Sequence, residues 1–198
     1  LNGVKLVQDL DYSVTYLSNK NVGTAKVVIC GKGVYTNSLT KTFTIRPETM
    51  ASAVINGCKA KYSYTGKQIK PLIQVVWNGK VLKNNTDYTL LYKNNKKRGA
   101  AGIVVSGKGN YSGTLTASFT IVRASVKKAS VTGLKAVYAR TGKAVRPKVT
   151  VKLGGKKLKK KRDYILSYRK NKKKGTALLY VKGVGNYSGT KKMKFKIR

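Results

Sequence analysis

Apolar and polar residues alternate along most of this chain, which is the pattern of half-buried β-strands. The last third of the chain contains four such segments, at residues 149–153, 164–168, 177–181 and 193–197. Turn-forming residues such as Gly154-Gly155 separate them. No segment has the 3.6-residue period of an amphipathic helix. We therefore expect an all-β fold of antiparallel sheets, each with one face in solvent.

The chain also repeats itself without gaps at an offset of 76 residues. An Asp-Tyr pair marks each copy at Asp11, Asp87 and Asp163. The second and third copies span residues 47–122 and 123–198, whereas residues 1–46 match only the later part of a unit. Six or seven short strands per copy predict tandem β-sandwiches. The short links near residues 46 and 122 favour a semi-rigid rod.

Two long stretches resemble a known kind of repeat. They read TDYTLLYKNNKKRGAAGIVVSGKGNYSGTLTASFTI and RDYILSYRKNKKKGTALLYVKGVGNYSGTKKMKFKI, and they follow YSYTGKQIKP and YARTGKAVRP. They are similar to the Ig-like repeats of large secreted and cell-surface proteins of gut-dwelling Gram-positive anaerobes. The resemblance implies tandem Ig-like antiparallel β-sandwich repeats and a secreted or cell-wall-attached location. Such repeats serve as spacers, adhesive modules or accessory domains beside enzymes, so the resemblance does not name a ligand.

Charge distinguishes the third copy from the other two. The chain has 43 Lys and Arg residues against 5 Asp and Glu, a net charge of +38. Residues 1–46, 47–122 and 123–198 carry net charges of +4, +9 and +25. On the last strand, the alternation places Lys192, Lys194 and Lys196 outward where the second copy has Thr116, Ser118 and Thr120. The candidate polyanion-binding residues are Lys148, Lys152, Lys159, Lys160, Lys161, Arg162, Arg169, Lys170, Lys172, Lys173, Lys174, Lys192, Lys194 and Lys196.

This charge predicts a diffuse polyanion-binding surface, because Lys attracts phosphate, sulfate and carboxylate groups as a point charge. The expected partners of such an adhesin segment are anionic glycans of a host or polymers of the bacterial wall. Two alternatives stay open: a module that binds host mucosal proteins such as immunoglobulin, and a passive spacer or accessory domain of a larger protein. We do not expect nucleic acid as a specific ligand, since no recognition motif or base-stacking platform is visible. No apolar run is long enough for a transmembrane helix.

The residue types argue against catalysis. The chain has no His and only two Cys, so the sequence predicts neither a metal site, a cofactor site nor a Ser-His-Asp or Cys-His arrangement. The recurrent Asp residues precede strands, where we expect them to accept backbone N–H bonds and to pair with neighbouring Lys or Arg. Tyr187 and its equivalents are predicted to bond to the backbone through their hydroxyls, as in a tyrosine corner. Cys30 and Cys58 could form a disulfide or remain free thiols.

Overall fold

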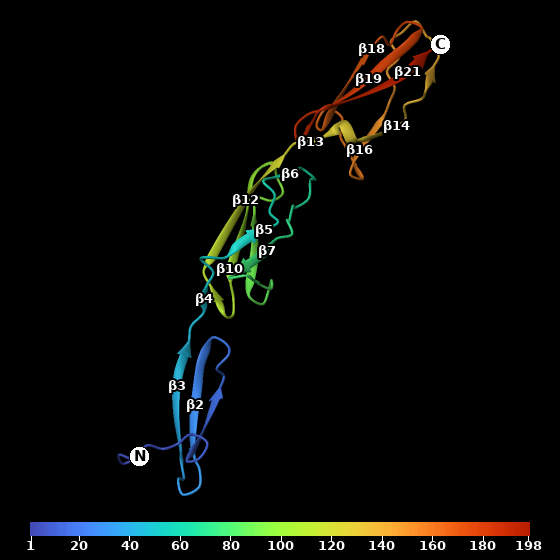
Figure 1. The fold of residues 1–198 in the computed structure, drawn as a ribbon. Helices are drawn as coiled ribbons and strands as arrows, with labels where there is room; N and C mark the ends of the chain where they lie inside the picture. Colours follow the sequence, from blue (N-terminus) through green and yellow to red (C-terminus); the bar gives the residue numbers. More distant parts are fainter. The chain divides into compact units, whose positions relative to one another are not determined.

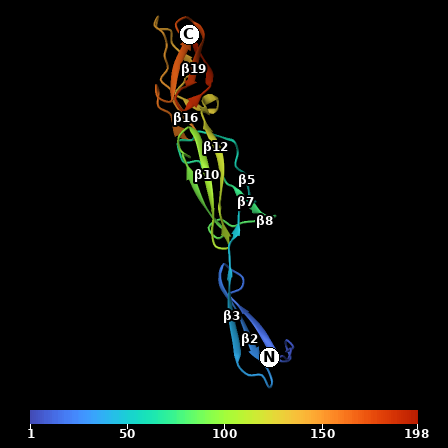
Figure 2. The ribbon, with the colours of Figure 1, turned by 90° about the vertical axis from the view of Figure 1, so that its left-hand side faces the viewer.

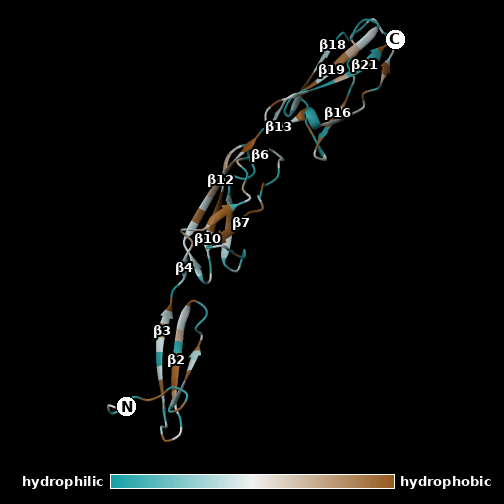
Figure 3. Cartoon of the chain, in the orientation of Figure 1, coloured by the Kyte–Doolittle hydropathy of each residue, from teal (hydrophilic) through white to brown (hydrophobic).

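A computed structural model describes all residues from 1 to 198, and its regular elements are β-strands apart from one 3-10 turn. The all-β prediction is therefore confirmed. Figure 3 shows hydrophobic and hydrophilic residues following one another along strands such as β2 (Gly23–Gly31) and β12 (Thr114–Val122). The structure has no helix with the length and apolar character that a membrane crossing requires.

Residues 1–46 form one antiparallel sheet in the order β1-β2-β3, in which β1 spans Tyr12–Leu17 and β3 spans Ser38–Ile45 (Figure 1). The register pairs Ala25 with Phe43. Phe43 is 42% exposed, whereas its equivalents Phe119 and Phe195 are 3% and 2% exposed. The reason is that β1–β3 form a single layer, while the later copies each have a second sheet to cover this position.

The second copy contains two larger sheets and one short strand pair. Its strands are β4 (Glu48–Thr49), β5 (Val54–Asn56), β6 (Lys61–Ser63), β7 (Gln74–Trp77), β8 (Lys80–Val81), β9 (Tyr88–Lys93), β10 (Gly99–Gly107), β11 (Tyr111–Ser112) and β12. One sheet has the order β6-β12-β10-β9 and the other β5-β7-β8, while β4 pairs with β11. Figures 1 and 2 show β10 and β12 side by side.

The third copy repeats this topology. Its strands are β13 (Ala124–Ser125), β14 (Ser130–Thr132), β15 (Val137–Tyr138), β16 (Thr150–Leu153), β17 (Lys156–Lys157), β18 (Tyr164–Arg169), β19 (Gly175–Gly183), β20 (Tyr187–Ser188) and β21 (Thr190–Ile197). The 3-10 turn η1 covers Val126–Lys128. The sheets β15-β21-β19-β18 and β14-β16-β17 share one buried core that includes Val151, Leu179 and Phe195. This arrangement is consistent with a β-sandwich.

The sheets differ from the prediction in strand number and direction. Each later copy has nine strands rather than six or seven, because several pairings cover only two residues. The sheets are also not wholly antiparallel: β15 pairs with β21, and β13 with β20, in parallel. These parallel partners are too short to show an alternating pattern, so periodicity could not reveal them.

The recurrent Asp residues anchor the turn before a strand, as predicted. In each copy an Asp carboxylate accepts the backbone N–H of the residue four positions earlier, with N···O distances of 2.8 to 2.9 Å. The third copy adds an ion pair, in which Arg162 donates two hydrogen bonds of 2.9 Å to Asp163. The prediction for Tyr187 was wrong, however. The backbone bond of this kind is made by Tyr168, whose hydroxyl donates to the carbonyl of Pro147 at 2.9 Å.

By its contacts the chain divides into two compact units. One comprises residues 1–57, 73–91 and 103–117, and the other comprises residues 58–72, 92–102 and 118–198. The whole third copy therefore lies in the second unit, together with every candidate binding residue. Cys30 and Cys58 are free thiols.

Candidate functional site

The outer face of the sheet β15-β21-β19-β18 carries the densest regular array of cations. Cross-strand register places Lys194, Leu178 and Arg169 in one row, and Lys192, Tyr180 and Ser167 in the next. Because these positions alternate with buried Leu179 and Phe195, their side chains emerge on the solvent side. The lysines on β21 are two residues apart, which spaces them by about 6.8 Å.

Tyr180 lies at the centre of this face and was not among the predicted binding residues. It is half-buried, and the Arg169 guanidinium carbon lies 5.8 Å from its ring centroid. The signal was present in the sequence, since Tyr180 falls between the inward residues Leu179 and Val181. The face therefore combines cations with one aromatic ring, which makes a cation–π contact with Arg169.

The equivalent face in the second copy has fewer cations, with Lys93 at the position of Arg169 and Lys61 paired with Thr120. Val104 stands where the third copy has Tyr180, and Gly102 stands where it has Leu178. The three lysines of β21 correspond to Thr116, Ser118 and Thr120 on β12. Because the strand order of the two sheets is the same, the second copy shows which neutral residues can stand in place of the three β21 lysines.

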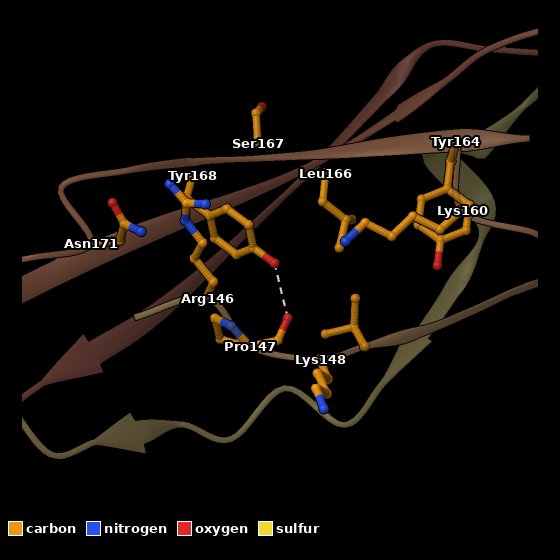
Figure 4. Close-up of a pocket in the computed structure, with 10 residues that line it drawn as sticks. Arg146, Pro147, Lys148, Lys160, Tyr164, Leu166, Ser167, Tyr168 and Asn171 are labelled. Carbon is orange, nitrogen blue, oxygen red and sulfur yellow. Dashed lines mark hydrogen bonds between the residues drawn. The ribbon is translucent and has the colours of Figure 1, made fainter. Parts of the chain in front are cut away.

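A groove opens along the free edge of β18 (Figure 4). Its volume is about 560 Å³. Tyr164, Leu166 and Tyr168 of β18 form one wall, and residues 146–149 form the other. The Tyr168–Pro147 hydrogen bond crosses the groove. Asn171 closes one end by donating its side-chain N–H to the carbonyl of Val145 at 2.9 Å.

Two cations reach into this groove. Figure 4 shows the Arg146 guanidinium beside the Tyr168 ring and the Lys160 side chain extending toward Leu166. Burial raises the pKa of the Tyr168 hydroxyl, and the positive charge of Arg146 opposes that shift. The hydroxyl therefore stays protonated as a donor. Arg146 was not among the predicted residues, because it lies in a segment without alternation.

All the predicted residues are exposed, but they do not form one site. Lys192, Lys194, Lys196 and Arg169 share the sheet face described above. Lys152 belongs to the other sheet, where its register partner is Lys157. The remaining residues lie beside the groove or in the two loops that flank β18, namely Lys148, Lys159, Lys160, Lys161, Arg162, Lys170, Lys172, Lys173 and Lys174.

Two of these residues are poorly placed for a ligand. Arg162 is engaged with both oxygens of Asp163, and this hydrogen bonding raises the pKa of its guanidinium. The Lys148 side chain points away from β18 in Figure 4, although its stem lines the groove. By contrast, the loop of Lys170 to Lys174 surrounds a shallow hollow of about 550 Å³ at the end of β18.

Comparison of the chain with family models, with curated proteins and with solved structures found no match. The resemblance to Ig-like surface repeats therefore stays a prediction from the sequence.

Proposed function

We propose that the third copy is a non-enzymatic module that binds anionic polymers, carried on a rod of tandem Ig-like β-sandwiches in a secreted or cell-wall-attached protein. Host glycans with sulfate or carboxylate groups and wall polymers with phosphate groups share the chemistry that this surface would attract. The short links between copies support the rod, because they leave little flexible chain between neighbouring units.

One observation carries the proposal: the third copy has almost no acidic residues to balance its positive charge. Residues 123–198 contain 26 Lys and Arg residues and a single acid, Asp163. Asp163 is 5% exposed and already paired with Arg162. Every other cation of the copy therefore repels its neighbours in the free protein, and a polyanion would relieve that repulsion.

The regular spacing on β21 favours a polymer over a single small anion. Three lysines whose Cα atoms recur at intervals of about 6.8 Å offer a track for charges that recur along a polymer. The Lys170–Lys174 loop extends this cationic surface beyond the end of the strands, next to Arg169. Affinity should then come from many weak contacts and should fall steeply with salt.

The test uses the full chain on immobilised heparin and, separately, on immobilised teichoic acid. The variant K192T/K194S/K196T installs the residues that the second copy has at these positions. If all three lysines contact the polymer, the slope of log affinity against log salt becomes shallower by about 2 to 3. Binding to heparin alone would indicate a host glycan, and binding to teichoic acid alone a wall polymer.

A second variant controls for net charge. K93S/K96S/K97S removes the same charge from exposed positions of the second copy. If the two variants lose affinity equally, the lysines of β21 act only through the total charge and the assignment of the sheet face is wrong. Elution of the unmodified chain no later than a neutral β-sandwich protein would refute polymer binding altogether and favour the spacer role.

A further inference from the structure

The free edge of β18 leaves backbone hydrogen-bonding groups without a strand partner. β18 pairs only with β19, so its other side is open. Val184 donates to the carbonyl of Asp163 on the β19 side, and Lys161 donates to the carbonyl of Tyr164 on the open side. The N–H and C=O groups of successive residues in a strand point to opposite sides. Those of Leu166 and Tyr168 therefore face the open side, as those of Tyr164 do.

These groups lie along the groove, between its two inward cations. Arg146 is beside Tyr168 at one end, and Lys160 reaches toward Leu166 from the other. Neither cation forms an ion pair, since the only salt bridge in the chain joins Arg162 to Asp163. The groove thus presents a row of backbone donors and acceptors with positive charge at both ends.

We propose that this groove binds an acidic peptide segment in extended conformation, which adds to the sheet as a strand beside β18. An added strand would satisfy the backbone groups of Leu166 and Tyr168, and its Asp or Glu side chains would meet Arg146 and Lys160. A polysaccharide has no regular row of amide groups to match a strand edge, so backbone complementarity favours a peptide. Charge complementarity selects an acidic one, because the third copy offers no free carboxylate to repel it.

This site is independent of the polymer-binding face, which lies on another surface of the same sheet. The second copy has Lys70 and Asn84 at the positions of Arg146 and Lys160. The edge of β9 therefore has one cation fewer than the edge of β18. The third copy alone carries both inward cations, which makes it the copy where a peptide should bind.

The experiment measures binding of a fluorescent eight-residue peptide of alternating Glu and Val to the full chain by polarisation. Two control peptides have the same charge: one is N-methylated at alternate residues so that it cannot pair with a strand edge, and one has a scrambled order. The protein variants are R146Q and K160N, the second of which installs the residue of the second copy. We expect each variant to weaken binding by about threefold and the pair by about tenfold.

N-methylation at the edge-facing residues should abolish binding, whereas K192T/K194S/K196T should leave it unchanged. Equal affinity for the methylated and unmethylated peptides would overturn the strand-addition proposal, because charge alone would then explain binding. Loss of heparin affinity in R146Q/K160N as large as that in the β21 variant would assign the groove to the polymer instead. Failure of polymer binding with retention of the methylation effect would reject the proposed function and leave this site standing.

Discussion

The turn before β18 depends on a single buried carboxylate, and its replacement gives a quantitative test of the structure. Asp163 accepts the backbone N–H of Lys159 at 2.9 Å and two bonds from Arg162, also at 2.9 Å. D163N keeps one acceptor oxygen but loses the charge and the second acceptor. The Arg162 side chain is 59% exposed, so solvent screening limits the ion pair to at most about 1 kcal/mol. With the weakened backbone bond, we expect a loss of about 1 to 2 kcal/mol in the free energy of unfolding at pH 7.

The same substitution should show a defined pH dependence. The hydrogen bonds from Arg162 lower the pKa of Asp163 below its ordinary value, even though burial acts in the opposite direction. A carboxylate whose pKa is lower in the folded state contributes its full stability above the unfolded-state pKa of about 3.9. That contribution disappears as the pH falls through the folded-state pKa. The difference between D163N and the unmodified chain should therefore shrink below about pH 4.

Urea denaturation combined with hydrogen exchange of peptides from β18 measures this effect locally. D87N is the matched control, because Asp87 accepts the backbone N–H of Lys83 at 2.8 Å but has Thr86 in place of the guanidinium. Its loss of stability at pH 7 should be smaller, because no guanidinium pairs with the Asp87 carboxylate. The reasoning would be refuted if D87N cost as much as D163N, or if the D163N loss were the same at pH 7 and pH 3.

Two further pairs of substitutions test the packing. F195A should lower the free energy of unfolding by about 3 to 5 kcal/mol, while F43A should cost about 1 kcal/mol or less, because the two rings are 2% and 42% exposed. Similar losses in urea denaturation would contradict the layered sheets. G183A should cost about 2 to 3 kcal/mol, since its Cβ would lie 2.6 Å from the backbone nitrogen of Ser188. G142A has open space and should cost about 1 kcal/mol from its positive φ alone, and the reverse order would argue against this turn.

Much of the fold could be read from the sequence because strand periodicity is local. The alternation identified the long strands and correctly placed Lys192, Lys194 and Lys196 outward, since a charged side chain next to buried Phe195 must take the solvent side. The same rule applied to Leu179 would have placed Tyr180 outward as well. The turn role of Asp163 also followed from sequence, because its partners Lys159 and Arg162 are near neighbours in the chain.

The groove could not be predicted in this way. Arg146 lies before β16 and Lys160 lies between β17 and β18. Only the packing of residues 146–149 beside β18 brings Arg146 next to Tyr168 in the groove that Lys160 also lines. The parallel pairing of β15 with β21 likewise joins two-residue segments far apart in the chain. Sequence alone thus determined which residues alternate, where the chain turns and how charge is distributed. Tertiary structure decided which strand edge stays open and which cations face it, because those properties depend on contacts between segments that no local pattern encodes.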